Sequence, residues 1–468
     1  MRVERRQFLQ LLPFSVAAAA GCSVVPTREQ PREFHLRAME GHALRDPGKP
    51  GVLAWTYNGG VPGPQLRVRQ RDRVRIHVEN LLSVPTTVHW HGVRVPNAMD
   101  GVPHLTQRPI APGERFTYEF DALDAGTYWY HSHFKSSEQM ERGLYGMMIV
   151  DEPDDLPFSR DVTWLLDDWR ITASGSVSET FGNAHDISHA GRIGNVVTVN
   201  GSMHEEFAIR TGERIRLRLA NAANARIFAL KFQNHRPLII ALDGHPVRPH
   251  EPVQDRVILA PGMRCDLLLE GSQQPGTRHD VQDLFYPRDA YVLMQLVYEN
   301  EARAADLTAF TPAPANPLPE PDLTSAAVHE IRFEGGMMGS LHRALLDGQP
   351  TDMRALLRRG KAWAVNGVVS DGHAMQPSLH LKRGRSYLFR MNNATRWHHS
   401  IHLHGHTFRV LRRNGKATDH QEWQDTVLMA PDEHVDVAFV ADNPGDWMFH
   451  CHIVEHMEGG MMSVIRVL

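Results

Sequence analysis

The stretch Arg73-Val-Arg-Ile-His-Val-Glu-Asn80 alternates polar with apolar residues before it ends in two polar ones. Successive side chains of a strand point to opposite faces, so this pattern predicts a strand with one apolar face. Gln65-Leu-Arg-Val-Arg69 and Arg214-Ile-Arg-Leu-Arg-Leu219 show the same alternation, and we expect half-buried strands there too. Glycine and proline turns punctuate the chain at short intervals, for example Pro261-Gly262 and Asn443-Pro444-Gly445. Many short strands with frequent turns predict an all-β protein built from sandwiches.

A loose internal repeat divides the chain. Asn58-Gly-Gly60, Asn200-Gly-Ser202 and Asn366-Gly-Val368 each precede an alternating strand, and each of these strands is followed by an asparagine. The copies lie about 140 and about 165 residues apart, which is domain-sized rather than solenoid-sized. The sequence therefore predicts three related domains, at residues 31–155, 156–305 and 327–468, with a linker at 306–326.

The third copy has features of its own. Pro-rich Phe310-Thr-Pro-Ala-Pro-Ala-Asn-Pro-Leu-Pro-Glu-Pro321 predicts an extended linker before it. Two short stretches, Ser340–Leu346 and Asp352–Arg358, are candidates for helices.

Composition excludes some classes of function. The 468 residues include 50 basic and 54 acidic ones, so the formal net charge is −4 and nothing suggests a nucleic-acid partner. Three cysteines cannot form a disulfide framework, and Cys265, inside an apolar run, is expected to be a buried strand residue. The 29 histidines are the most informative feature, because imidazole is the commonest metal-ligating side chain.

Residues 1–30 look like a targeting segment. Arg5-Arg6-Gln7-Phe8-Leu9 precedes an apolar stretch too short to span a bilayer, and it resembles a twin-arginine export signal. Ala19-Ala20-Gly21-Cys22 also resembles a lipoprotein cleavage box. We therefore expect a periplasmic protein, either free or anchored by a lipid on Cys22. No later stretch is long and apolar enough to predict a membrane span.

Histidine pairs gather in four clusters. Two lie in the first copy of the repeat, two in the last and none in the middle one. They are His89-Trp-His91, His131-Ser-His133, His399-Ser-Ile-His402-Leu-His404, and His450-Cys451-His452-Ile-Val-Glu-His456 followed by Met461. A metal site built from them would lie between the first and third domains.

The last cluster contains the ligand types of a blue copper site. A thiolate, two imidazoles and a distant thioether bind copper in electron-transfer proteins. Cys451, His456 and Met461 are spaced five residues apart, and His399 would supply the second imidazole from another strand.

Strand alternation separates Cys451 from its two neighbours. Cys451 would point to one face of its strand, and His450 and His452 to the other. This arrangement predicts a short covalent bridge from the blue copper to a second metal site. Each His-x-His pair would likewise place two imidazoles on one face, about 7 Å apart, far enough to serve different metals. One such pair alone is weak evidence. Other histidines, including His185, His189, His245 and His420, are expected to be surface or hydrogen-bonded residues.

Together, the four clusters resemble the copper-binding motifs of the multicopper oxidases, over residues of about 32–468. The resemblance implies three cupredoxin-like Greek-key sandwiches and four copper ions. It implies a type 1 copper on His399, Cys451, His456 and axial Met461, and a type 2 copper on His89 and His402. It implies a type 3 pair on His91, His131, His133, His404, His450 and His452.

The resemblance also implies a mechanism. A reductant would give one electron at a time near His399 or His456, and the electrons would pass through Cys451 to His450 and His452. Four electrons would reduce dioxygen to water. Asp100, in the turn Met99-Asp100-Gly101, matches an acidic residue that assists proton movement, as a carboxylate near bound oxygen can. An acid often follows the last type 1 histidine, but here that residue is Met457, so the role must be absent or shift to a neighbour.

The substrate is less constrained by these residues. Thr395-Arg396-Trp397 precedes the first type 1 histidine, and Met337, Met338 and Met353 are a modest thioether supply. We expect a laccase-like activity on phenols and aromatic amines, with oxidation of Cu(I) or Fe(II) as the alternative. A copper-sequestering protein or a copper-free scaffold is the alternative of another class. We expect a monomer.

Overall fold

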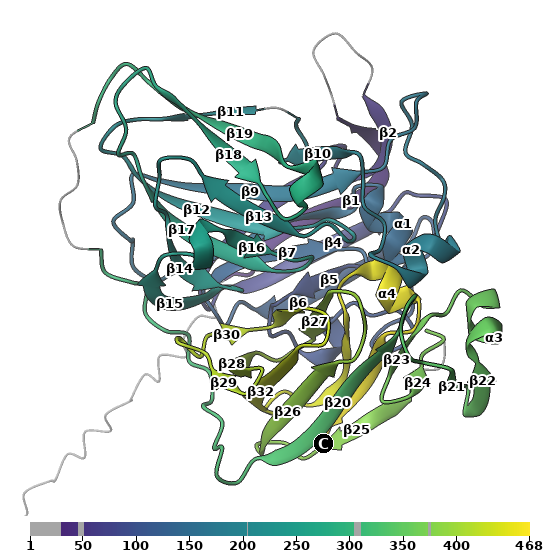
Figure 1. Cartoon of the computed structure of the whole chain (residues 1–468). Coiled ribbons are helices and arrows are strands. Elements are labelled where there is room, and N and C mark those ends of the chain that lie inside the picture. The colour runs from purple at the N-terminus through teal and green to yellow at the C-terminus, as the bar shows by residue number, and fades with distance from the viewer. Residues whose placement is uncertain (1–29, 45–50, 204, 304–309, 373–375) are drawn as a thin grey trace, which may run out of the picture. The chain divides into compact units, whose positions relative to one another are not determined.

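The computed structural model describes residues 30–44, 51–203, 205–303, 310–372 and 376–468, drawn in colour in Figure 1. The predicted export segment, except its last residue, lies outside this part of the chain, and so does Cys22. In the described part, none of the helices has the length and apolar character needed to cross a bilayer.

The predicted first domain contains two four-stranded sheets, β2-β1-β4-β6 and β3-β8-β7-β5. Its elements are β1 (Arg32–Ala43), β2 (Val52–Tyr57), β3 (Gly63–Arg69), β4 (Arg73–Asn80), β5 (His89–His91), η1 (Asn97–Met99), β6 (Arg115–Asp121), β7 (Gly126–His131), α1 (Ser136–Glu141) and β8 (Tyr145–Asp151).

The predicted middle domain contains the sheets β10-β9-β12-β17-β14-β15 and β11-β19-β18-β13-β16. Its elements are β9 (Arg160–Trp169), α2 (Ala184–Ser188), β10 (Val196–Val199), β11 (Glu205–Ile209), β12 (Arg214–Asn221), β13 (Phe228–Phe232), β14 (Leu238–Leu242), β15 (His245–His250), η2 (Val253–Asp255), β16 (Val257–Leu259), β17 (Arg264–Glu270), β18 (Arg278–Asp283), η3 (Pro287–Asp289) and β19 (Tyr291–Tyr298).

The predicted third domain contains a sheet ordered β22-β21-β24-β23-β20-β26-β32-β28-β29, with β30 paired to β28, and a second sheet β25-β34-β33-β27-β31. Its elements are β20 (Ala327–Gly335), β21 (Arg343–Leu346), β22 (Gln349–Asp352), α3 (Met353–Arg358), β23 (Trp363–Val365), β24 (Val368–Val369), β25 (Pro377–Leu381), β26 (Ser386–Asn393), β27 (His399–Leu403), β28 (Phe408–Arg413), β29 (Lys416–Ala417), β30 (Trp423–Gln424), β31 (Thr426–Met429), β32 (His434–Val440), β33 (Gly445–Cys451), α4 (Val454–Glu458) and β34 (Met462–Val467).

Each pair of sheets encloses its own apolar core, so the prediction of three β-sandwiches is confirmed. The strands pair in the same way in all three. β1 with β4, β9 with β12 and β20 with β26 are parallel, and the following partners β6, β17 and β32 are antiparallel. The domain limits themselves stay predictions.

The asparagines of the Asn-Gly motifs make equivalent hydrogen bonds. Asn58, Asn200 and Asn366 have φ of 58°, 52° and 50°, a region that asparagine tolerates better than most residues. Each donates from Nδ2 to a carbonyl of the first strand of its predicted domain, which is β1, β9 or β20, and accepts at Oδ1 from an N–H of that same strand. The side chain thus fixes the turn to the strand beside it.

The strand Arg214–Asn221 differs from the expectation of a half-buried strand, because both of its faces are buried. Its charged face lies against the first domain rather than water. Arg216 donates to Glu152 at 2.8 Å and to Asp266 at 2.9 Å, and Arg218 donates to Asp161 at 2.7 Å. Paired arginines can be buried, so the alternation predicted the strand but not its surroundings.

One of the two predicted helices is wrong. Residues 343–346 form β21, which pairs with β22 across a two-residue turn at Asp347 and Gly348, with φ of 53° and 72°. An Asp-Gly turn with positive φ at both positions favours a hairpin over a short isolated helix. The other prediction is confirmed: α3 follows Asp352, whose side chain caps the helix by accepting from Ala355 N at 2.8 Å.

The Pro-rich linker is anchored at Asn316, which is buried against the first and middle domains. Its Oδ1 accepts from Ala125 N at 2.9 Å, and its Nδ2 donates to Ala125 O at 2.8 Å. Asn316 Nδ2 also lies 3.1 Å from His245 Nδ1. His245 is therefore a buried, hydrogen-bonded histidine, as expected. Cys265 is buried in β17, also as expected.

We predict that Asn316→Ala destabilises the fold by about 1–3 kcal/mol, because the buried backbone of Ala125 would lose both partners. Thermal or denaturant unfolding measures this change. Exposed Asn300→Ala is the matched control and should leave stability unchanged within about 0.5 kcal/mol. Equal stability of the two variants would show that the linker is not anchored there.

Candidate metal centre

Two strand pairs bring the predicted histidines together. β5 pairs with β7, which sets His89 opposite His131, and β27 pairs with β33, which sets His402 opposite His450. The first pair belongs to the first domain and the second pair to the third. The side chains that meet between them form the histidine cluster, which comprises His89, His91, His131, His133, His402, His404, His450 and His452, all buried.

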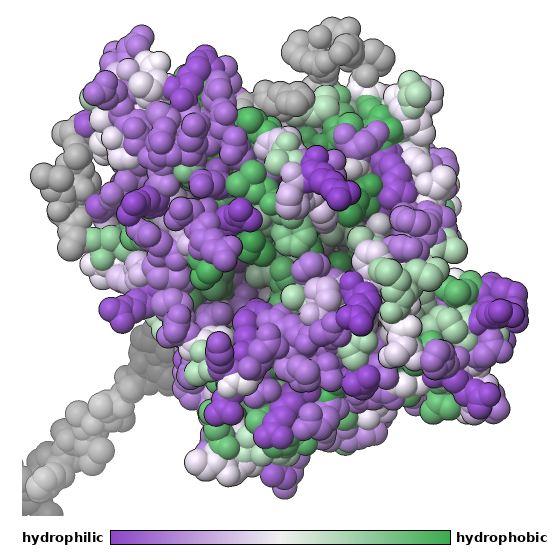
Figure 2. All heavy atoms as spheres, viewed as in Figure 1, coloured by the Kyte–Doolittle hydropathy of each residue, from purple (hydrophilic) through white to green (hydrophobic). Residues whose placement is uncertain are grey.

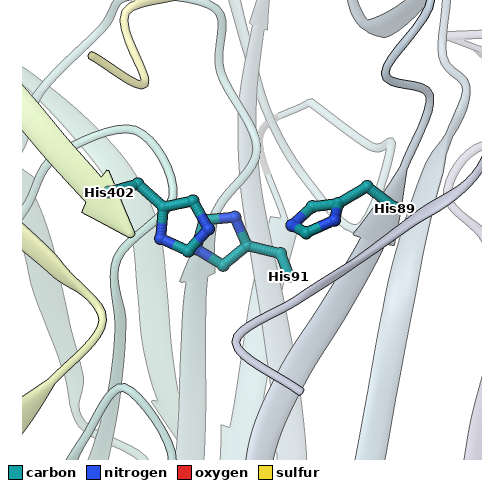
Figure 3. Close-up of side chains that lie close together, drawn as sticks. All are labelled: His89, His91 and His402. Atoms are coloured by element: carbon teal, nitrogen blue, oxygen red, sulfur yellow. The ribbon is translucent and has the colours of Figure 1, made fainter. Parts of the chain in front are cut away.

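The imidazole nitrogens of the cluster converge in three groups. Within each group, the nitrogens lie within 4.8 Å of one another. The groups are His89, His91 and His402; His91, His131 and His452; and His133, His404 and His450. Figure 3 shows the first group, in which the His91 and His402 rings stack with centroids 3.8 Å apart and His89 points toward them.

Three of the four His-x-His pairs divide between groups, as strand alternation predicted for different metals, whereas His89 and His91 share the first group. His131 and His133 belong to different groups, and so do His450 and His452. Their ring centroids are 5.9 Å and 5.8 Å apart, closer than the 7 Å expected from backbone rise.

The hydrogen bonds of the cluster leave one nitrogen of most rings without a partner. His89, His131 and His402 each donate from Nδ1 to a backbone carbonyl at 2.8–2.9 Å. Their Nε2 atoms are buried and have no hydrogen-bond partner among the described residues. His91 is reversed, since its Nε2 faces Asp425 Oδ1 at 3.2 Å and its Nδ1 lacks a partner. Buried lone pairs aimed at a common centre fit a metal-ion cluster.

Burial also keeps these rings neutral. Desolvation and neighbouring imidazoles hold the pKa of six of them well below 6.5: His91, His131, His133, His404, His450 and His452. Their nitrogens are therefore free of a competing proton at neutral pH. Neutral imidazoles suit copper better than a hard, oxygen-seeking ion.

Asp100 lies beside the cluster, as predicted. Its Oδ2 accepts from His404 Nδ1 at 2.9 Å and its backbone carbonyl accepts from His89 Nδ1 at 2.8 Å. It also closes the turn after η1, so the two interpretations of this residue are compatible. Its Oδ1 is buried without a hydrogen-bond partner among the described residues. Its role in proton movement stays a prediction.

A second group lies on the other face of β33. Cys451 Sγ is 3.5 Å from His399 Nδ1 and 3.7 Å from His456 Nδ1, and all three residues are buried. The two Nδ1 atoms are 3.0 Å apart. Burial raises the pKa of the Cys451 thiol to about 12 and lowers the pKa of His456 to about 3. Met461, also buried, joins this group through its backbone, which accepts from Cys451 N at 3.1 Å.

Three residues to which the sequence gave no role at the copper ligands contact these rings. Thr395 Oγ1 lies 2.9 Å from His399 Nε2, and the carbonyl of His189 accepts from His456 Nε2 at 2.7 Å. Both contacts turn Nδ1 toward Cys451. Trp363 packs against both imidazoles, with ring centroids 4.9 Å and 4.3 Å away. The sequence around Trp363 in β23 does not predict this contact with the imidazoles, because the contact depends on tertiary packing.

Around α4, the acidic neighbours of His456 have structural partners. Glu455 accepts from Ser137 Oγ at 2.9 Å and from Asn224 Nδ2 at 3.0 Å, while Glu458 accepts from Ser137 N at 3.0 Å. These bonds tie α4 to α1, beside which it lies in Figure 1. Met457 is buried in an apolar cluster with Trp129.

Family models described as multicopper oxidase match residues 40–155, 160–279 and 347–468. The chain belongs to the multicopper oxidase family. It is 30% identical to Multicopper oxidase MmcO of Mycobacterium tuberculosis, a match that covers 96% of this chain and 91% of that protein. It is 28% identical to Laccase-3 of Thanatephorus cucumeris, with 92% and 90% covered.

A solved structure of a multicopper oxidase from Pseudomonas thermotolerans has the same fold, with a TM-score of 0.82 and 34% sequence identity. The similarity covers 94% of this chain and 100% of that one. Membership of the family shows a copper-containing oxidoreductase that passes electrons from a reducing substrate to dioxygen.

We predict that the protein keeps its copper in mild acid. A group whose pKa is lowered stays neutral to a lower pH than a free imidazole, so the six cluster imidazoles with a pKa well below 6.5 bind protons less readily in mild acid. Copper content after dialysis at pH 5 should therefore equal that at pH 7, with circular dichroism as the control for folding. Progressive loss with a midpoint near 6.5, the value of an unperturbed imidazole, would contradict this prediction.

Proposed function

We propose that the chain is a laccase-like multicopper oxidase with four copper ions, which oxidises phenols and aromatic amines one electron at a time and reduces dioxygen to water. His399, Cys451, His456 and axial Met461 would hold the type 1 copper, and His89 and His402 the type 2 copper. His91, His131, His133, His404, His450 and His452 would hold the type 3 pair. The observation that carries the proposal is the convergence of unpartnered, neutral imidazole nitrogens directly behind Cys451.

The geometry supports a division of labour between the two faces of β33. When bound, copper would supply a one-electron acceptor beside Cys451 and the electrons for dioxygen within the histidine cluster. Cys451 would lose its thiol proton on metal binding. The backbone then joins Cys451 directly to His450 and His452, which gives a continuous covalent route between the faces. Trp363 and the apolar core around it would exclude water from the Cys451 side.

We predict that Cys451→Ser removes the blue colour and the oxidation of substrate, and lowers the copper content by about one ion per chain, because only the thiolate group loses its strongest ligand. Absorption, electron paramagnetic resonance and elemental analysis measure these effects. Cys265→Ser, at the other buried cysteine, is the matched control and should stay blue. A Cys451→Ser protein that stays blue would contradict the assignment.

The electron entry point would be the cavity beside α2. It has a volume of about 560 Å³ and is open to solvent. It is lined by Arg170, Thr180, Asn183, His185, Asp186, His189, Ala190, Gly191, Ile193 and Trp397. Figure 2 shows apolar residues in a hollow near the centre of this face of the molecule, among mostly hydrophilic surroundings. The carbonyl of His189 joins this cavity to His456, so a reductant in the cavity would be one residue away from the type 1 site.

The aromatic rings in the cavity favour an aromatic substrate. Trp397 packs edge-on against His189 with centroids 5.2 Å apart, and its Nε1 donates to Met337 O at 2.9 Å, which fixes the indole. Arg170 is paired with Asp186 at 2.6 Å, so the wall carries no unpaired charge that would select an ionic reductant. A neutral aromatic wall suits a phenol or an aromatic amine.

Metal oxidation is the second candidate, because His185 and His189 stack on the same rim with centroids 4.2 Å apart, and the backbone N–H of exposed Met337 donates to the carbonyl of Ser188, between them in the chain, at 2.7 Å. An imidazole pair near a thioether could hold Cu(I) or Fe(II) for oxidation.

We also propose that the twin-arginine signal directs export of the protein to the periplasm, with or without a lipid on Cys22, and that the protein is a monomer.

Steady-state kinetics with a dimethoxyphenol, Cu(I) and Fe(II) under one set of conditions separates the candidates. For a phenol oxidase, Trp397→Ala should lower kcat/KM for the phenol by about 2–10-fold, through loss of a ring contact of about 0.5–1.5 kcal/mol, and Trp397→Phe by less. The metal rates should not change. The opposite pattern, in which His185→Ala reduces only the metal rates, would favour metal oxidation. Exposed His420→Ala is the control for both.

A further inference from the structure

The middle domain contributes none of the proposed copper ligands, yet it reaches the histidine cluster with a buried arginine. Arg264 is the first residue of β17, and Asp243 lies in the turn between β14 and β15. Both meet Asp425 of the third domain, which directly precedes β31. All three side chains are fully buried.

The guanidinium of Arg264 uses all five of its N–H donors. Nη1 and Nη2 donate to the two carboxylate oxygens of Asp425, at 2.7 and 2.5 Å. The remaining donors bind the backbone carbonyls of Thr127 at 3.2 Å, Gly262 at 3.1 Å and Asp243 at 3.0 Å. A forked pair with every donor satisfied fixes the plane of the carboxylate as well as its position.

Asp243 fixes the backbone that carries the carboxylate. Its Oδ1 accepts from Arg264 N at 2.9 Å, and its Oδ2 accepts from Asp425 N at 3.2 Å and Thr426 N at 3.0 Å. One side chain of the middle domain thus holds the start of β31, and Arg264 holds the side chain that projects from it.

Asp425 in turn contacts two rings of the histidine cluster. Its Oδ1 lies 3.2 Å from His91 Nε2, and its backbone carbonyl accepts from His402 Nδ1 at 2.9 Å. Thr426 Oγ1 adds a contact of 3.0 Å to His91 Nε2. These bonds turn His91 Nδ1 and His402 Nε2, the two nitrogens without partners, toward the centre of the group drawn in Figure 3.

The middle domain also lies against the histidine cluster at Gly262, where φ is +87°. A Cβ atom there would lie 2.9 Å from His452 Cγ and 3.0 Å from His91 Cε1, so only glycine fits. Ser400 Oγ of β27 donates to the neighbouring Pro261 carbonyl at 2.7 Å. The turn between β16 and β17 therefore presses against the rings that Arg264 helps to orient.

We propose that Arg264 is a positioning residue, through which the middle domain sets the ring orientation of His402 and so the affinity of the type 2 site that His402 shares with His89. Through the same contacts it orients His91, which is assigned to the neighbouring type 3 pair. The inference rests on the proposed copper assignment. It goes beyond that assignment by giving the middle domain a role in metal binding. A buried ion pair is by itself weak evidence for a role in stability, which leaves orientation as the function that the five-donor geometry serves.

The test is Arg264→Lys, which keeps the charge but loses the fork, in the copper-loaded protein. We expect about 10–100-fold weaker retention of one copper ion against a competing chelator. The type 2 signal in electron paramagnetic resonance should shift or be lost, while the blue absorption stays. These readouts would not respond to a loss of stability alone.

Arg218→Lys is the matched control. Arg218 is as buried, lies in the same sheet on β12 and donates to Asp161 at 2.7 and 2.8 Å, but none of its hydrogen bonds within the described part of the chain is to an imidazole. It should lower the melting temperature and leave the type 2 signal unchanged. A wild-type signal and copper affinity in Arg264→Lys, or equal changes in both variants, would overturn the proposal.

If Arg264→Lys does not fold, Asp243→Asn provides the second variant, since it keeps the shape and leaves the Arg264–Asp425 fork in place. It should weaken copper retention in the same direction, and full retention would overturn the proposal. A wild-type protein without a type 2 signal after copper loading would instead contradict the copper assignment itself, so the two failures are distinguishable.

Discussion

Successive side chains of a β-strand point to opposite faces, and in β33 this alternation places candidate metal ligands on both faces of the strand. His450 faces the histidine cluster while Cys451, one residue on, faces His399 and His456. The antiparallel pairing of β27 with β33 sets a second strand of histidines beside the first, so both faces receive partners at once. No flexible loop is needed to bring the two groups within one peptide unit of each other.

Desolvation gives this arrangement its chemistry. Deep burial keeps the imidazoles neutral and leaves their unpartnered nitrogens as a cost that a soft metal ion would remove. The same burial raises the pKa of the Cys451 thiol to about 12, so this group is inert as a thiol and becomes a ligand only when a metal replaces its proton. The buried imidazole nitrogens therefore lack hydrogen-bond partners in the metal-free protein, and metal binding would remove this cost.

The three domains contribute differently to the candidate metal centre. The first and third supply the converging histidines, and the middle one surrounds them with fixed polar contacts. Arg264 clamps Asp425, and His189 offers its carbonyl to His456. Under the proposed assignment, a domain that has no metal motif of its own would orient rings of the histidine cluster and line the cavity where the electron donor binds.

The sequence by itself determined the three sandwiches and the list of histidines and cysteine that meet, because alternation and the spacing of residues such as His450 and Cys451 are local properties of a strand. It failed at Ser340–Leu346, where a tight Asp-Gly hairpin outweighed a helical composition, and at the charged face of β12, which is buried against another domain. Only the tertiary structure revealed Trp363, the His189 carbonyl and the contacts of Arg264. Their roles depend on which distant backbone or ring each one touches, and no periodicity within a single strand encodes such a contact.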